Sequence, residues 1–168
     1  MSELKTLEGK EVATILTPTT VALVTAQDGQ GDCVATCAWV NPLSHEPSLI
    51  GVCLRPGGRT ARAIVDGGCF CANVLGTDCA DIAIACGKKG PNQPERFETA
   101  GLTKVTCKTV EAVRVAQAIG WIECELVEHH TFGDHELYVG RTLLAQTRGD
   151  DALLMQGRSA FGHFEIAK

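Results

Sequence analysis

The chain has 168 residues, enough for one domain with a sizeable core, and 45% hydrophobic and 21% charged residues are ordinary for a globular protein. Its net charge of −5 comes from interspersed acidic and basic residues, which argues against nucleic acid as the main partner. No apolar run approaches the roughly 20 residues of a membrane-spanning helix, and MSELKTLEGKE at the start lacks the apolar core of a signal peptide. We therefore expect a single domain, residues 1–168, that is cytoplasmic and not membrane-bound.

The first half of the chain predicts a helix, then strands with a two-residue period. In chain order, the predicted elements are a helix over Leu4–Leu16, a strand over Thr20–Ala26, a hairpin turn over 28–32, a return strand to about Trp39, a loop over 41–47, a strand over Leu49–Leu54, a short helix over Thr60–Val65 and a strand over Cys69–Leu75. Within the last strand, Phe70, Ala72 and Val74 share one face, as expected for a strand with one buried side.

The second half predicts one well-marked helix and two longer strands. Asp78–Cys86 has an apolar stripe at helical spacing, with Asp78 able to cap its start and Gly87 able to end it. A basic loop over 87–96 follows, and the strands cover Trp121–Val127 and Asp134–Ala145. In the first of these, Glu123 and Glu125 alternate with apolar residues, which predicts a solvated face rather than a catalytic carboxylate pair. Many strands and few helices predict a mainly β (α+β) fold, a mostly antiparallel β-barrel with inserted helices.

The segment Leu49–Leu75 has the parts of a phosphate-binding corner. An apolar strand runs into a glycine-rich loop that opens directly into a helix, whose N–H groups and dipole favour an anion. Arg55, Arg59 and Thr60 add positive charge and a hydroxyl. The spacing matches neither a Walker loop nor a dinucleotide fingerprint. Arg55 and Arg62 fit a solvated surface charge equally well.

The cysteines and histidines give weaker signals. Nine cysteines are an odd number on a chain without an export signal, so reduced thiols packed in the core are expected rather than disulfides. The pairs at 33 and 37 and at 69 and 71 lack the C-x-x-C spacing of a zinc site, and His129 and His130 point to opposite faces of a strand. We expect no metal site.

Five segments, in the same order, resemble the flavin reductase-like family of FMN-binding split β-barrels. They are ALVTAQDGQGD (22–32), ATCAWVNPLSHEPSLIGVCL (35–54), RTARAIVDGGCFCANVL (59–75), CGKKGPNQPERFETAGLT (86–103) and IECELVEHHTFGDHELYVG (122–140). The chain is most similar to the short branch with flavoredoxins and ferric reductases. The resemblance implies the cofactor FMN and a homodimer with the flavin near the subunit interface.

The resemblance also implies roles for single residues. Arg59 and Thr60 match the loop that holds the FMN phosphate, and His135 matches a histidine near the approaching nicotinamide or acceptor. The residues matching the flavin surroundings are Thr36, Cys37, Ala38 and Trp39 beside the ring, Ser44 close by, Cys53 and Leu54 on the lining strand, and Asn73 near it. Where relatives often carry a serine-glycine pair, this chain has Lys88-Lys89, so Lys88 or Lys89 is a candidate contact to a phosphate.

The function that this resemblance implies is an oxidoreductase that passes electrons from NAD(P)H through FMN to an acceptor. The acceptor is free flavin, ferric iron, a small organic molecule or a protein, and the cofactor supplies the redox chemistry. Cys53 is a candidate for electron transfer to metal or disulfide substrates, with plain packing as the alternative. Two other functions stay open: an FMN-binding electron-transfer protein reduced by a protein partner, and a flavin-binding module without turnover.

Overall fold

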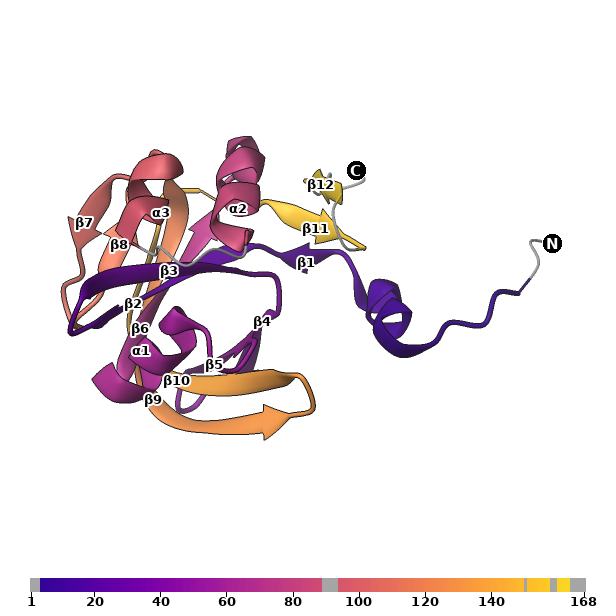
Figure 1. Ribbon diagram of the computed structural model, residues 1–168, viewed down its shortest axis with the longest axis horizontal. Helices are drawn as coiled ribbons and strands as arrows, with labels where there is room; N and C mark the ends of the chain where they lie inside the picture. Colours follow the sequence, from indigo (N-terminus) through magenta and orange to yellow (C-terminus); the bar gives the residue numbers. More distant parts are fainter. Residues whose placement is uncertain (1–3, 89–93, 150, 158–159, 164–168) are drawn as a thin grey trace.

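A seven-stranded antiparallel sheet forms the body of the computed structural model (Figure 1), which describes residues 4–88, 94–149, 151–157 and 160–163. Its strand order is β3-β2-β6-β9-β10-β5-β4. The strands are β2 (Ala22–Asp28), β3 (Gly31–Cys37), β4 (Val40–Ser44), β5 (Leu49–Leu54), β6 (Cys69–Leu75), β9 (Ala118–Phe132) and β10 (His135–Thr147).

Smaller elements surround this sheet. A three-stranded sheet has the order β1 (Thr19–Thr20), β11 (Leu154–Gln156), β12 (Ala160–Gly162), and β7 (Lys104–Thr106) pairs with β8 (Val113–Val115). The helices are η1 (Gly9–Leu16), α1 (Arg59–Gly67), η2 (Thr77–Cys79), α2 (Ala80–Gly87) and α3 (Pro94–Thr99), where η marks a 3₁₀-helix. No helix of the described residues is long and apolar enough to cross a membrane.

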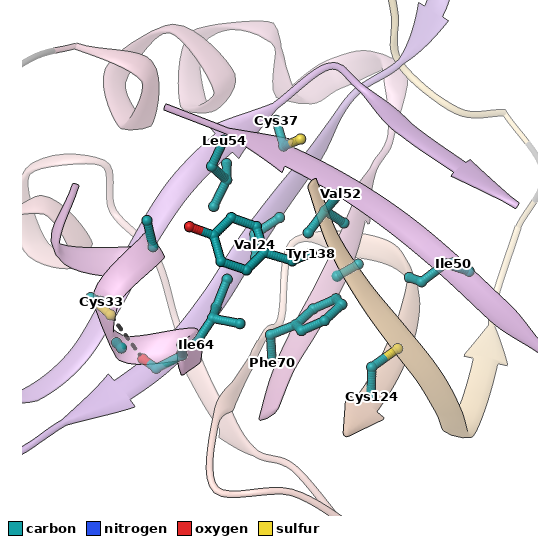
Figure 2. Close-up of a cluster of buried hydrophobic side chains, with 14 residues drawn as sticks. Val24, Cys33, Cys37, Ile50, Val52, Leu54, Ile64, Phe70, Cys124 and Tyr138 are labelled. Atoms are coloured by element: carbon teal, nitrogen blue, oxygen red, sulfur yellow. Dashed lines mark hydrogen bonds between the residues drawn. The ribbon is translucent and has the colours of Figure 1, made fainter. Parts of the chain in front are cut away.

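The sheet curls until the end of β3 meets β5. Cys53 N donates to Trp39 O at 3.0 Å, and the Cys37 thiol donates to Cys53 O at 3.2 Å. Figure 2 shows the interior that this closure encloses, where Tyr138, Phe70 and Ile64 of α1 lie among smaller side chains. Helix α1 thus contributes its apolar face to the barrel core, which fixes the position of its N-terminus.

The outer face of the sheet is covered as well. Phe97 of α3 and Ala83 of α2 pack with Leu23 of β2 in a second buried cluster. Farther along, the loop between β7 and β8 covers Cys71 of β6 in a third. In Figure 1 the two helices and the β7–β8 hairpin lie on the same side of the sheet.

The fold class expected from the sequence is confirmed, together with the strands over Leu49–Leu54 and Cys69–Leu75. The predicted helix over Leu4–Leu16 is the shorter η1, which projects from the body (Figure 1) and has no buried residue. The loop predicted over 41–47 contains β4, an edge strand that tolerates Pro42 because it pairs on one side. The loop predicted over 87–96 overlaps α3, which begins at Pro94.

The expectation that Glu123 faces solvent is wrong. Its side chain is 0% exposed, and Glu125, two residues on, pairs with Arg141 at the surface. The strand pattern correctly puts both on one face, but the loop after β7 covers only the first. The loop lies over Glu123 through a tertiary contact, which the alternation of residues along a strand cannot predict.

Candidate functional site

A groove of about 1260 Å³ runs between the ends of β3 and β5, the start of α1, the end of α2 and the η1 segment. Its lining is strongly basic although the whole chain carries a charge of −5. Among the described residues, six cationic ones line it against one carboxylate, Asp134; they are Lys10, Arg55, Arg59, Arg62, Lys88 and Arg96. Such a groove favours an anionic ligand, and its volume suits a nucleotide-sized one.

The N-terminus of α1 lines this groove and has the geometry of an anion site. The loop before it turns at Gly57, whose φ of 75° favours glycine, and the N-cap Gly58 supplies no side-chain cap. The first intrahelical bond is donated by Arg62 N to Gly58 O, so the preceding N–H groups of the first turn have no partner within the helix. They are available to an oxyanion in the groove.

Thr60 adds a hydroxyl at the same place. The residue is 2% exposed and lines the groove, yet Oγ1 makes no well-formed hydrogen bond within the described part of the chain. Its nearest polar neighbour is the weakly polar thiol of Cys33: burial raises the pKa of Cys33 to about 11, and the interaction with the Thr60 hydroxyl lowers it in part. A buried hydroxyl without a proper partner costs stability, which is typical of a position completed by a ligand.

Arg59 lines the groove at the start of α1 and is also paired with a carboxylate. Its Nε and Nη2 bind the two carboxylate oxygens of Asp28 at 2.7 Å each, and Nη2 also donates to Gly31 O. This hydrogen bonding lowers the pKa of Asp28 to about 2. Arg59 still lines the groove, but part of its charge is neutralised.

The segment from Thr36 to Trp39 forms one wall of the groove. Thr36 Oγ1 donates to Ala83 O at 2.7 Å, which ties this segment to α2. The Cys37 thiol is bonded to Trp39 O and Cys53 O, and burial raises its pKa to about 12. Both side chains therefore fix the backbone of the wall.

His135 and Trp39 meet at the edge of the groove. Their ring centroids are 4.5 Å apart, and His135 Nδ1 lies 2.8 Å from Asp134 Oδ1. The contact with His135, helped by the charge of Arg55, lowers the pKa of Asp134. Cys53 is partly buried in the same wall, and burial raises the pKa of its thiol, which favours the protonated form.

Three of the expected site residues are not placed at the groove. Asn73 is fully buried on the outer face of the sheet, where Nδ2 donates to Leu23 O and Oδ1 accepts from Val115 N. Its amide thus joins β6 to its neighbours, and the expectation that it lies near the cofactor is not supported. Ser44 ends the edge strand β4 and does not line the groove. Lys89 lies outside the described residues.

Two of the cationic residues in the described lining of the groove, Arg96 and Lys10, were not site candidates from the sequence. Arg96 of α3 donates to Val34 O, Cys86 O and Lys88 O, and so holds the end of α2 beside the groove. The sequence showed that residues 87–96 are basic, but it did not show that the Arg96 side chain reaches the groove. Lys10 of η1 lies in no recognisable sequence motif. It reaches the groove only because the N-terminal segment folds beside it.

These features define a class of protein: antiparallel β-barrels that bind a nucleotide-sized anion in a basic groove at the N-terminus of a helix. The comparisons specify the family, since the profile of the flavin reductase like domain matches residues 15–163. The chain therefore belongs to the flavin reductase-like family and has its split-barrel fold.

Relatives and solved structures agree with this assignment. The reductase component of a 4-nitrophenol 4-monooxygenase/4-nitrocatechol 2-monooxygenase from Rhodococcus opacus is 30% identical over 86% of this chain and 74% of its own. The NADH-dependent FMN reductase AsuE2 of Streptomyces nodosus is 32% identical over 75% and 67%. The FMN-binding protein of Thermus thermophilus superposes with a TM-score of 0.82 at 22% identity, covering 100% of both chains. Streptomyces globisporus NADH:FAD oxidoreductase SgcE6 has a TM-score of 0.85 at 19% identity, over 98% and 100%.

Proposed function

We propose that this protein is an NAD(P)H-dependent reductase that binds FMN in the basic groove and passes electrons to a small acceptor or a protein. The observation that carries the proposal is the buried Thr60 hydroxyl, without a proper partner, at the N-terminus of α1 in a cation-lined groove. It fits a phosphate monoester, which FMN has. The names of relatives that are FMN and FAD reductases support a flavin in general.

The residues of the groove then have distinct roles. Thr60 and the first-turn N–H groups of α1 hold the phosphate, and Arg59 adds charge from its place beside Asp28. The wall from Thr36 to Trp39 orients the flavin ring. FMN held by these residues would supply the redox chemistry, namely hydride acceptance and electron transfer. Trp39 and His135 shape the edge of the groove where the nicotinamide approaches. Holding the nicotinamide ring next to the flavin ring supplies most of the rate acceleration.

The electron acceptor is proposed from the names of relatives. One relative is the reductase component of a nitrophenol monooxygenase, and another is the reductase subunit of a flavin-dependent monooxygenase. These names favour free flavin as the electron acceptor, to be delivered in reduced form to a monooxygenase, over ferric iron or a disulfide. The protein is further proposed to work in the cytoplasm.

We also propose a homodimer with the flavin near the interface. Helix η1 projects from the body with Ile15 and Leu16 69% and 76% exposed, while Lys10 and Thr14 of the same helix line the groove. A second copy packed on η1 would cover these apolar side chains beside the flavin site.

The test is a titration of the purified protein with FMN, followed by anaerobic addition of NADH or NADPH. Saturable binding and rapid bleaching of the flavin absorbance by either nucleotide are expected. Bleaching only by a reduced protein donor would indicate an electron-transfer protein instead. Failure to bind FMN or FAD would contradict any flavin-dependent function.

A further inference from the structure

Three of the nine cysteines gather under the loop between β7 and β8. Cys69 and Cys71 lie two residues apart on β6, so both face the outer side of the sheet. Cys107 begins the loop above them, and it packs with Cys71 and Ala112 in one buried cluster. Cys69 Sγ lies 3.7 Å from Glu111 O of the same loop. Among the described residues that line the groove, none belongs to this cluster.

The side chains of Cys71 and Cys107 pack together in this buried cluster. The interaction with the Cys107 thiol, together with burial, raises the pKa of Cys71, which favours its protonated form. Cys71 is 0% exposed and Cys107 7% exposed. The two sulfurs are therefore distinct: Cys107 is the one that a small oxidant reaches, and Cys71 lies behind it.

The loop that carries Cys107 is held firmly in this position. Glu123 accepts hydrogen bonds from Lys108 N at 3.0 Å and from Thr109 N at 2.6 Å, and Cys107 N donates to Ala112 O. These bonds fix the backbone of the loop that carries Cys107, and the β6 ladder fixes the backbone of Cys71, so the two side chains are held in one cluster. A disulfide needs two cysteines whose backbones already bring their side chains together.

We propose that Cys71 and Cys107 form a peroxide-sensitive thiol pair that closes to a disulfide between β6 and the β7–β8 hairpin. The Cys107 thiolate attacks one peroxide oxygen, the O–O bond breaks, and the departing hydroxide takes a proton to give water and a sulfenic acid on Cys107. The Cys71 sulfur then attacks the Cys107 sulfur, the S–O bond breaks, and the Cys71 proton leaves with the hydroxyl as water. In sum, two thiols and one hydrogen peroxide give one disulfide and two waters.

The experiment treats the folded protein with increasing hydrogen peroxide, blocks remaining thiols and digests it with trypsin without reductant. Cleavage after Lys104 and Lys108 isolates Cys107 in the peptide 105–108, while Cys71 lies in the peptide 63–88. The expected product is these two peptides joined, lighter by two hydrogen atoms, with fragmentation placing the bond at Cys71. The bond should also raise Tm by roughly 5–10 °C, since it closes the loop from 71 to 107.

Variants separate this pair from the neighbouring thiol. Cys107→Ala, at the rim of the cluster, should abolish both the cross-link and the Tm rise, and Cys71→Ala the cross-link. Cys69→Ala, the matched control from the same face of β6, should retain both. The proposal is overturned if Cys107 goes on to sulfinic acid without a cross-link, if the bond forms through Cys69, or if the complete cross-link leaves Tm unchanged.

Discussion

Thr60 is buried at a helix N-terminus, with a hydroxyl that the protein alone does not satisfy. We predict that Thr60→Val, which keeps the shape and removes the oxygen, weakens FMN binding by about 1 kcal/mol, or five- to tenfold. The same change should leave the free energy of unfolding of the FMN-free protein unchanged or slightly higher, because a poorly paired polar atom is lost. Fluorescence titration with FMN and urea denaturation measure the two effects.

Thr25→Val is the matched control. Thr25 Oγ1 is also buried, but it donates to Val113 O at 2.5 Å and lies away from the groove. This substitution should lower the free energy of unfolding by about 1–2 kcal/mol and leave FMN affinity unchanged. Equal losses of affinity in both variants would mean that Thr60 acts only through the fold.

The pair Asp28–Arg59 predicts a specific pH dependence of stability. Because the pKa of Asp28 is lowered to about 2 by Arg59, its stabilisation is fully present above the ordinary aspartate pKa near 4. It is lost as the pH falls from about 5 towards 2. After allowance for solvent screening of a partly exposed pair, we expect about 1 kcal/mol.

Asp28→Asn should remove that part of the acid sensitivity. Urea denaturation of the parent and the variant at pH 7 and pH 3 gives the measurement, and the difference in unfolding free energy between the two proteins should shrink at the lower pH. A difference that is the same at both values would show that Arg59 does not stabilise the Asp28 carboxylate.

Two carboxylates on the same face of strand β9 differ in burial: Glu123 is buried and Glu125 is at the surface. Glu123 is buried, forms an ion pair with Arg114 and accepts three hydrogen bonds from Lys108 and Thr109. Burial alone would raise its pKa, but these hydrogen bonds outweigh that effect and lower it. We predict that Glu123→Ala lowers the free energy of unfolding by about 3–5 kcal/mol, because Arg114 is left buried without its partner.

Glu125→Ala is the control from the same face of β9. Its ion pair with Arg141 is exposed, so the expected loss is under about 1 kcal/mol. Thermal or urea denaturation of both variants provides the comparison. Losses of similar size would contradict a supporting role for Glu123 beneath the β7–β8 loop.

Elements with strong local patterns were predictable from the sequence. The helical stripe from Cys79 to Cys86 predicted α2, and the apolar run over Leu49–Leu54 predicted β5 with the same bounds. The three-residue strands β7, β8, β11 and β12 were not predicted, because so few residues show no period and pair only through the tertiary fold. The same limitation explains why the burial of Glu123 was not predicted, because it depends on the loop between β7 and β8.

The site was predictable where it follows the chain and not where it depends on distant contacts. The wall from Thr36 to Trp39 and the Thr60 corner, both named from the sequence, line one groove. Asn73 lies on the outer face of the sheet and is absent from the described lining of the groove, a position that its place on a predicted strand did not indicate. Arg96 was missed because its three carbonyl partners come from separate elements.

At the scale of the whole molecule, the unburied η1 predicts self-association. Light scattering should give twice the 17.8 kDa of one chain, and Leu16→Glu should shift the protein towards the monomer with an unchanged circular dichroism spectrum. Val105→Glu, on the exposed strand β7 at the opposite end in Figure 1, is the control and should remain a dimer. A monomeric parent protein would contradict the proposed homodimer.

Gly140 and Phe70 are 70 positions apart yet form one steric unit. A Cβ at Gly140 would lie 2.5 Å from Phe70 Cζ and 2.7 Å from Cys124 Cβ, so the aromatic ring occupies the space that the glycine leaves. A larger residue at 140 therefore needs a smaller residue at 70 and a small shift of the strand at Cys124. We expect the two positions to covary among relatives, and a relative that pairs Phe at 70 with a bulky residue at 140 would have to bend β10 differently.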